Sequence, residues 1–504
     1  MLSKILPLYY RKRLLFNAIL SVAQVIVLGG TYFIIYTILL KNLGSQKLGT
    51  WSIVLSTSSI ANIANIGLSS SLVKYIASYS NDLETNTYKI NNLIKTSVLS
   101  IGAFVGIVCI CLYFLGYYFL KSALPLTELE EAIILLPFSL ASLWISSLGG
   151  VFLSTLDGFH SSSLRSLIYM ISALIFVFLG WQLLPFYGLL GIAIAQITQS
   201  LTIVFLSIVG IKLVFKNLVI LPLRWDKQTF NHIFKFSMNF QIIGLTQLLY
   251  DPITKFFLAK YGGLSFVGYY EMASRLIVQV RTLIVSANQV VVPSIATNST
   301  NNIDESYPKI LNLVILFTFP VIVGVIIFTP FISYYWIGHY EFYFITSLLI
   351  LTISWFFNII STPSYFSSIG LGSLQGILFS HIFIAIANIS LGWLLGFSFG
   401  GIGVIVAWGV SLVSGSLITV IYYNRKFRAN LKNINQKQFY NNLISSFLCI
   451  CISYYLFERE NSSTSPNILL LYSILIYFLY LMITISIYMN AQKILKNEIS
   501  KIKT

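Results

Sequence analysis

The stretch "DPITKFFLAKYGGLSFVGYYEMASRLIVQVR", residues 251–281, places five charged side chains inside two long apolar segments. They are two acids and three bases: Asp251, Lys255, Glu271, Arg275 and Arg281. At the centre of a membrane helix each such charge costs roughly 2.5–3.5 kcal/mol on the insertion scale. Charges at that depth pair with each other, line an aqueous cavity or hold an ionic substrate. The stretch therefore predicts both a membrane protein and the place of its functional site.

The rest of the chain has the composition of a polytopic membrane protein. Of its 504 residues 57% are hydrophobic and only 9% are charged, against about 25% charged residues in a soluble domain. Long apolar runs, each able to cross the bilayer as a helix, predict an all-α protein with about fourteen transmembrane helices. The four histidines and four cysteines match no metal-ligand or disulfide spacing. We therefore expect no metal and no cofactor.

The distribution of basic residues predicts the orientation in the membrane. Most of the 31 Lys and Arg residues fall in loops on the side that both termini share. By the positive-inside rule both termini are expected to be cytoplasmic. The stretches 212–235 and 425–437 then become juxtamembrane loops that favour anionic lipid headgroups. The net charge of +16 is thereby explained without a nucleic-acid partner.

An internal repeat links two parts of the chain. The sequence "KNLGSQKLGTW" (41–51) is similar to "KYGGLSFVGYY" (260–270), which lies 219 residues later. The shared positions are Gly44 with Gly263 and Gly49 with Gly268. Six helices are therefore expected to repeat as six more, with two appended.

This repeat predicts the domain organisation. We expect an N-lobe of helices one to six at residues 1–225 and a C-lobe of helices seven to twelve at residues 226–430. Residues 431–504 would form helices thirteen and fourteen and a basic cytoplasmic tail. A cavity between two repeat-related bundles, with its site near the midplane, is the usual alternating-access arrangement.

Spacing divides the five charges into two pairs and one remaining base. Asp251 and Lys255 are four residues apart, as are Glu271 and Arg275, so each acid shares a helix face with the following base. Arg281 lies roughly 240° around the helix from Arg275, and no acid on its own helix is well placed to pair with it. The cluster sums to +1, which suits an anionic substrate. The alternative is an interhelical salt-bridge network that only locks the hairpin, and for Asp251 with Lys255 both interpretations remain open.

Polar side chains on the same two segments indicate a wet cavity instead of a lipid-facing surface. Pro252 lacks an N–H, so it should free the carbonyl of Leu248 and kink the helix beside Asp251. The candidate substrate-binding or translocation residues are Arg281, Arg275, Lys255, Asn288, Gln289 and Gln247. The candidate charge-pair or ion-coupling residues are Asp251 and Glu271, and no catalytic residue is predicted.

The order of several motifs resembles that of bacterial polysaccharide flippases. These are the O-antigen (Wzx-type) exporters of the multidrug/oligosaccharidyl-lipid/polysaccharide (MOP) superfamily, and the likeness covers essentially the whole chain. The motifs are "LGSQKLGTW" (43–51), "IGLSSSLVKYIA" (66–77), "VGYYEMASRL" (267–276) and "SANQVVVPSIA" (286–296).

The resemblance implies a V-shaped fold of two pseudo-symmetric six-helix lobes plus two C-terminal helices. It implies that an undecaprenyl-pyrophosphate-linked oligosaccharide is moved from the cytoplasmic to the periplasmic leaflet. The expected partners are this lipid-linked substrate, the bilayer and the polysaccharide polymerase machinery. The location that the resemblance implies is the bacterial cytoplasmic (inner) membrane, which the chain would cross many times. The cationic central cavity of the family would map onto Arg275 and Arg281, with Lys255 as a further candidate.

Three other functions are disfavoured by the sequence. Multidrug or cation antiporters of this fold often carry an acid in the first helix, and none occurs between Met1 and Asn81. A lipid II flippase would place arginines within its first helices, whereas Arg11 and Arg13 stop at the membrane entrance. A membrane-embedded glycan polymerase needs paired acids or a large aqueous loop, and the longest external loop is short. No G-x-x-x-x-G-K-[ST] motif is present, so direct ATP drive is not expected.

Overall fold

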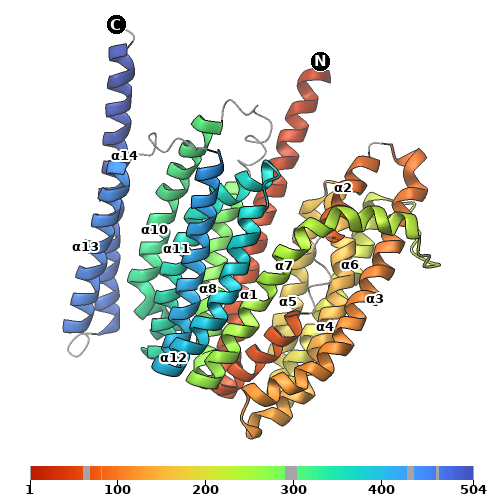
Figure 1. The fold of residues 1–504 in the computed structure, drawn as a ribbon, viewed down its shortest axis with the longest axis horizontal. Helices are drawn as coiled ribbons and strands as arrows, with labels where there is room; N and C mark the ends of the chain where they lie inside the picture. Colours follow the sequence, from red (N-terminus) through yellow and green to blue (C-terminus); the bar gives the residue numbers. More distant parts are fainter. Residues whose placement is uncertain are drawn as a thin grey trace. The chain divides into compact units, whose positions relative to one another are not determined.

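The computed structural model describes residues 2–60, 68–80, 82–289, 303–427, 436–460 and 465–502. Within these ranges every regular element is a helix, as the sequence predicts (Figure 1). The helices are α1 (Leu2–Ser59), α2 (Leu68–Tyr79), α3 (Leu83–Ala123), α4 (Leu126–Gly158), α5 (Ser162–Tyr187), α6 (Leu189–Val214), α7 (Lys227–Gly262), α8 (Leu264–Gln289), α10 (Ile303–Ile337), α11 (Phe342–Gly370), α12 (Gln375–Phe427), α13 (Gln436–Glu460) and α14 (Pro466–Ile502).

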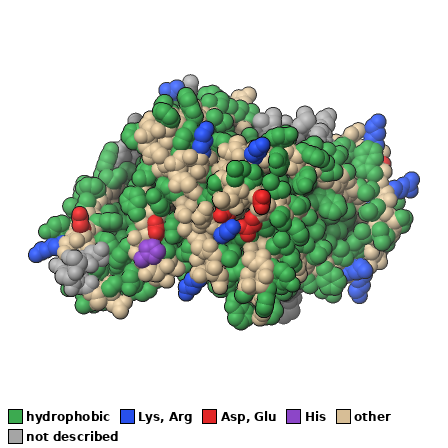
Figure 2. Space-filling model, turned by 90° about the horizontal axis from the view of Figure 1, so that it is seen from below, with side chains coloured by type: hydrophobic (Ala, Val, Ile, Leu, Met, Phe, Trp, Pro, Cys, Tyr) green, Lys and Arg blue, Asp and Glu red, His purple; other side chains and the backbone are tan. Residues whose placement is uncertain are grey.

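Ten of the described helices are long and apolar enough to cross a membrane. Two of them, α1 and α12, each contain two helices joined at a glycine. The helices α7 and α8 are not among the ten, and they are the two that carry the five charges of residues 251–281. Counting the halves of α1 and α12 separately and adding α7 and α8 gives the fourteen predicted helices. Figure 2 shows one face of the molecule, where hydrophobic side chains predominate and charged side chains are few.

Two pairs of glycines adopt matching backbone conformations in the two repeats. Gly44 has φ 83° and ψ 172°, and its repeat partner Gly263 has φ 83° and ψ 166°. Between α5 and α6, Gly188 has φ 56° and ψ −137°, while Gly400 within α12 has φ 62° and ψ −150°. Positive φ is readily accessible only to glycine. The matched turns support the internal repeat that the sequence predicts.

The repeat also has a reciprocal contact at which α1 crosses α8. A Cβ atom on Gly49 would collide with the backbone carbonyl of Leu264, and a Cβ atom on Gly268 would collide with the backbone carbonyl of Ser45. Ser45 and Leu264 are separated by the same 219 residues as the two glycines. Each repeat therefore presents its glycine to the corresponding residue of the other, which is the pattern of a local two-fold axis.

The described chain divides into two compact units. The first unit comprises Met1–Arg275 and Ala385–Val404. Its main hydrophobic core is built from α2 to α6, with Ile94, Leu156 and Ile211 completely buried. The contact-based units differ in kind from repeat-based lobes, so the predicted boundaries at residues 225 and 430 stay a prediction.

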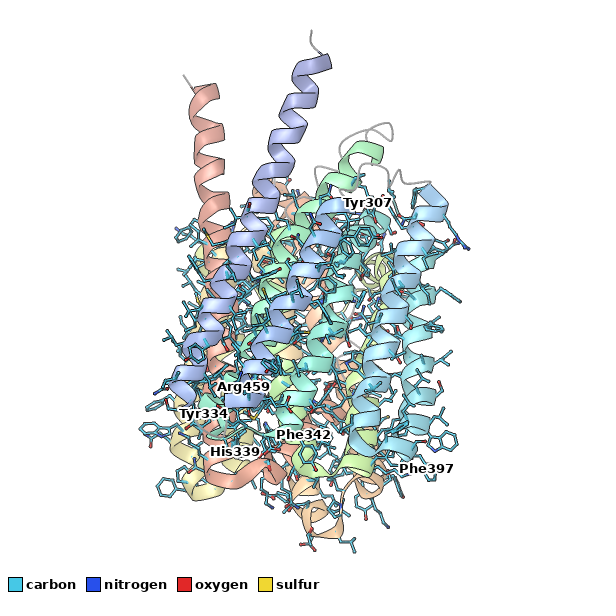
Figure 3. All side chains as sticks on the ribbon, turned by 90° about the vertical axis from the view of Figure 1, so that its left-hand side faces the viewer. Tyr307, Tyr334, His339, Phe342, Phe397 and Arg459 are labelled. Atoms are coloured by element: carbon cyan, nitrogen blue, oxygen red, sulfur yellow. The ribbon has the colours of Figure 1, made fainter. Side chains whose placement is uncertain are left out.

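The second unit comprises Leu276–Ile384 and Ile405–Thr504. In it α10 packs against α11, and Val323 and Ile327 of α10 form a core cluster with residues of the last two helices, α13 and α14. Figure 3 shows Tyr307 near one end of α10 and Tyr334 near the other. This unit holds the last of the five charged residues, Arg281.

The start of α7 is fixed by a side-chain cap. Asp226 accepts hydrogen bonds from the Thr229 backbone N–H, at 2.8 Å, and from the Thr229 hydroxyl. The hydroxyl contact is the main reason why the pKa of Asp226 is lowered from its ordinary value. Asn92 of α3 reaches the same pair, with 3.1 Å between its Nδ2 and the Thr229 Oγ1. The helix that carries Asp251 and Lys255 is thereby anchored to α3 at its beginning.

Candidate functional site

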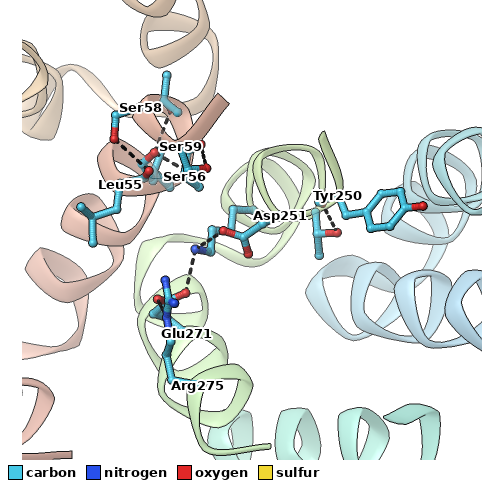
Figure 4. Close-up of polar contacts among 12 residues, drawn as sticks. Leu55, Ser56, Ser58, Ser59, Tyr250, Asp251, Glu271 and Arg275 are labelled. Carbon is cyan, nitrogen blue, oxygen red and sulfur yellow. Dashed lines mark hydrogen bonds and ion pairs between the residues drawn. The ribbon is translucent and has the colours of Figure 1, made fainter. Parts of the chain in front are cut away.

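Four of the five charges form a continuous chain of ion pairs across α7 and α8 in the first unit (Figure 4). The Lys255 Nζ lies 2.6 Å from the Asp251 Oδ2 and 2.7 Å from the Glu271 Oε2. The Arg275 Nε lies 2.7 Å from the Glu271 Oε1. Both predicted i,i+4 pairs are confirmed, and Lys255 with Glu271 joins the two helices. With two acids and two bases, this group of four ion-paired side chains has no net charge.

In this chain of ion pairs the two middle side chains are buried and the two end side chains are partly exposed. The Lys255 side chain is 1% exposed and that of Glu271 is 2% exposed, whereas those of Asp251 and Arg275 are 42% and 35% exposed. The Tyr36 hydroxyl of α1 donates to the Glu271 Oε1 at 2.8 Å. Glu271 thus has three partners, which is how a buried carboxylate offsets its desolvation. Of the two bases, Arg275 is the one that can meet a ligand in this conformation.

The helix does not end at Pro252, and no break beside Asp251 is needed to accommodate this residue. Pro252 lies inside α7, which is continuous from Lys227 to Gly262. Two residues further on, the buried Thr254 hydroxyl donates to the Tyr250 carbonyl at 2.9 Å, and the Asn388 Nδ2 lies 3.0 Å from the Thr254 Oγ1. A local kink remains a prediction, and Thr254 has its partners inside the protein.

A polar cavity of about 400 Å³ lies beside Arg275 within the first unit. The Arg275 guanidinium carbon is 5.2 Å from the centroid of the Tyr32 ring, a cation–π geometry. The described lining contains no Asp and no Glu, and Arg275 is its one charged residue. The polar lining residues come from α1, α4, α5, α6 and α8: Tyr32, Tyr36, Ser58, Ser59, Ser139, Ser142, Ser146, Tyr169, Gln196, Gln199, Ser200 and Arg275.

Arg281, in the second unit, has a different environment from Arg275. Its Nε donates to the Asn358 Oδ1 at 2.9 Å, and its guanidinium carbon lies 4.9 Å from the Trp355 ring centroid. The Asn358 Nδ2 in turn donates to the Ser416 hydroxyl at 3.1 Å. No carboxylate among the described residues forms an ion pair with Arg281. Within the described part of the chain Arg281 thus has an amide partner and no ion pair, and its predicted role in binding substrate stays a prediction.

The remaining predicted site residues are less informative. Gln247 is exposed on α7. The backbones of Asn288 and Gln289 belong to α8, but their side chains lie outside the described residues. Their predicted roles stay predictions.

Several residues of the two sites do not follow from the sequence reasoning above. Tyr32 and Tyr36 contact the charged chain, but aromatic residues are common in any membrane helix and give no signal. Gln196 and Gln199, three residues apart, and Asn358 do carry a signal, because uncharged amides inside apolar helices need partners. The first two line the cavity and the third binds Arg281. Amides in the sixth and tenth predicted helices could have directed attention to both places.

Comparison with known proteins identifies the family. The model of the family described as "Polysaccharide biosynthesis protein" matches residues 16–299, which include all five charges. The chain belongs to the polysaccharide biosynthesis protein family. Among curated proteins, one of Shigella flexneri with the description "Putative O-antigen transporter" is 21% identical over 396 residues, covering 77% of this chain and 92% of that protein.

Several solved structures have a fold similar to that of the present protein. A lipid II flippase, MurJ, in an inward closed conformation is similar with a TM-score of 0.70 and 18% identity, covering 95% of this chain and 99% of that one. An inward-facing multidrug resistance MATE transporter of the MOP superfamily is similar with a TM-score of 0.66 and 14% identity, covering 82% and 98%. The expected all-helical transporter fold is thereby confirmed.

Proposed function

We propose that this protein moves an undecaprenyl-pyrophosphate-linked oligosaccharide, such as an O-antigen repeat unit, from the cytoplasmic to the periplasmic leaflet by alternating access. Arg281 is the observation that carries the proposal, because it is a cation in a membrane helix without a carboxylate partner among the described residues. Family membership and the Shigella flexneri relative support a glycan-linked substrate. The four ion-paired residues around Glu271 sum to zero, so Arg281 accounts for the net charge of +1 of the five residues.

The chemistry of Arg281 suits a pyrophosphate. A guanidinium presents five N–H donors in a planar fork that matches phosphate oxygens. Asn358 accepts from Nε, and the terminal N–H groups are the ones that a phosphate would take. An anion that leaves a negative cell interior gains roughly 2.3 kcal/mol per charge per 100 mV. The membrane potential can therefore help outward movement.

The first test is substitution of Arg281. In Arg281→Ala we expect lipid-linked repeat units to accumulate on the cytoplasmic face and surface polysaccharide to fall by roughly tenfold or more, because charge-assisted hydrogen bonds are worth about 1.5–3 kcal/mol each. Arg281→Lys, which keeps the charge but loses the fork, should fall between Ala and wild type. Arg224→Ala, on an exposed loop, is the matched control and should export normally.

Each contrary result points to a different function. Normal export by Arg281→Ala at wild-type protein level would remove the assignment of this residue. Loss of dye efflux with intact surface polysaccharide on deletion of the gene would indicate a drug or cation antiporter. Lengthening of lipid-linked glycan by the purified protein would indicate a polymerase.

The proposed direction of transport requires both termini in the cytoplasm. Green fluorescent protein fused to the C-terminus should fluoresce, and alkaline phosphatase fused there should be inactive, because phosphatase folds only after export. Phosphatase fused after Glu460, at the end of α13, should be active. The opposite pattern of activities would invert the predicted orientation.

A further inference from the structure

The cavity beside Arg275 is built as a binding site and lies wholly within one compact unit. All its described lining residues belong to the first unit, so its form does not depend on the second. Its volume of about 400 Å³ is within the range of small-molecule sites, roughly 300–1,000 Å³. The chain of ion pairs explains the place of Arg275. It does not explain the rest of the polar lining, a wall formed by serines and two glutamines.

The serine hydroxyls of that wall are set up to accept hydrogen bonds. Ser59 donates to the Ser56 carbonyl at 2.7 Å, and Ser200 donates to the Gln196 carbonyl at 3.1 Å. A hydroxyl whose hydrogen is used in this way still has lone pairs that can accept. The Ser142 Oγ likewise lies 3.3 Å from the Gln196 carbonyl oxygen and 3.0 Å from the Ser200 Oγ. A ligand that brings its own hydroxyl donors would complement this wall.

Gln196 has an acceptor that nothing in the described structure satisfies. Its side-chain Oε1 is buried and has no hydrogen-bond partner among the described residues. A buried unsatisfied amide oxygen costs about 1–3 kcal/mol. Gln196 lines the cavity together with Gln199, one turn further along α6. Such an acceptor is expected where a ligand or water normally donates.

The charge of the cavity limits the kind of occupant. A metal cation or a cationic drug would meet the Arg275 guanidinium and no lining carboxylate. A purely apolar drug would leave the serines and amides without partners. A sugar ring has many hydroxyl donors and acceptors, tolerates a neighbouring arginine and gains from one when it carries a carboxylate.

We propose that this cavity is a subsite for one sugar unit of the transported glycan. The proposal rests on the proposed function, since it assigns the sugar part of the same substrate. Gln196, Gln199 and the serine hydroxyls bind the sugar hydroxyls. Arg275 also lines the site and favours an acidic sugar. Glu271 accepts a hydrogen bond from the Arg275 Nε and so positions Arg275. The terminal N–H groups of Arg275 are then the ones that donate to the ligand.

The test is the chemical accessibility of the cavity with and without glycan. Gln199→Cys is made in a variant whose four native cysteines, all free, are serines and which still exports glycan. A membrane-impermeant methanethiosulfonate should label Gln199→Cys in cells that lack the first glycosyltransferase. In cells that make the lipid-linked glycan, the labelling rate of Gln199→Cys should fall by about threefold. That decrease corresponds to glycan bound in about two thirds of the cavities. Glu130→Cys, at an exposed position, should be labelled equally in both strains.

The outcomes separate this proposal from the proposed function. If Gln199→Cys is not labelled, or is labelled equally in both strains, while deletion of the gene still abolishes export, the subsite is wrong and the flippase assignment stands. If deletion leaves export intact, the flippase assignment fails and the subsite fails with it. Gln199→Ala should lower export several-fold and Gln199→Asn should restore part of it. Equal export by Gln199→Ala, Gln199→Asn and the wild type would also overturn the subsite.

Discussion

Replacing Glu271 by Gln should lower the free energy of unfolding by about 3–5 kcal/mol, the cost of removing one partner from a buried ion pair. Glu271 is buried and is the common partner of Lys255, Arg275 and Tyr36. Its neutral replacement leaves the chain of charges with a net +1, and the 1%-exposed ammonium of Lys255 keeps only Asp251. Thermal unfolding of the detergent-solubilised protein measures the loss, which should also appear as a lower protein level in the membrane.

A double variant separates charge balance from other effects of the substitution. Lys255→Met combined with Glu271→Gln removes both buried charges and leaves Asp251 and Arg275, the two open ends of the chain. Much of the lost stability should return. The matched control is Glu131→Gln in the pair of Lys47 with Glu131, whose side chains are 34% and 33% exposed. It should cost no more than about 1 kcal/mol. A Glu271→Gln protein as stable as this control would show that the buried pair contributes little.

The sequence predicts the pairs of this site because they are local. Spacing of four residues fixes which side chains share a helix face, and the two i,i+4 pairs follow from that geometry alone. The contact of Lys255 with Glu271 depends on how α7 and α8 pack, which no spacing rule reveals. The contact of Tyr36 with Glu271 joins residues 235 positions apart, and a tyrosine in a membrane helix carries no distinctive signal. The serine wall of the cavity is a similar case, because serine is common where helices merely pack closely.

The fold is more predictable than the site for a related physical reason. Apolar runs of about 20 residues must cross the bilayer as helices, since no other open structure satisfies the backbone there. The boundaries inside α1 and α12 are less evident, because Gly44 and Gly400 join two helices without a polar loop. Hydropathy identifies the apolar length, whereas the positive φ of a single glycine decides where the chain turns.

Gly268→Ala should destabilise the crossing of α1 and α8 by about 1–3 kcal/mol or more, the usual range for overpacking. The new Cβ would be closer to the Ser45 carbonyl oxygen than van der Waals radii allow, and it would lie 3.2 Å from the Gly49 backbone nitrogen. Both obstacles are backbone atoms, so no side-chain rotation can relieve the collision and the helices must separate. Thermal unfolding and surface polysaccharide measure the effect. Gly150→Ala, at a helix position with nothing within 4 Å of the added Cβ, should be neutral or stabilising by up to about 1 kcal/mol.

The reciprocal geometry gives a sharper expectation for the double variant. Gly49→Ala alone should be destabilising through the Leu264 carbonyl, as Gly268→Ala is through Ser45. If both glycines belong to one crossing, the first alanine already pushes α1 and α8 apart, so the second should cost less than it does alone. Residues in contact typically show such coupling at about 0.5–3 kcal/mol. Additive losses would mean that the two contacts relax independently, and the local two-fold axis would then be a resemblance of backbone positions without mechanical coupling between the repeats.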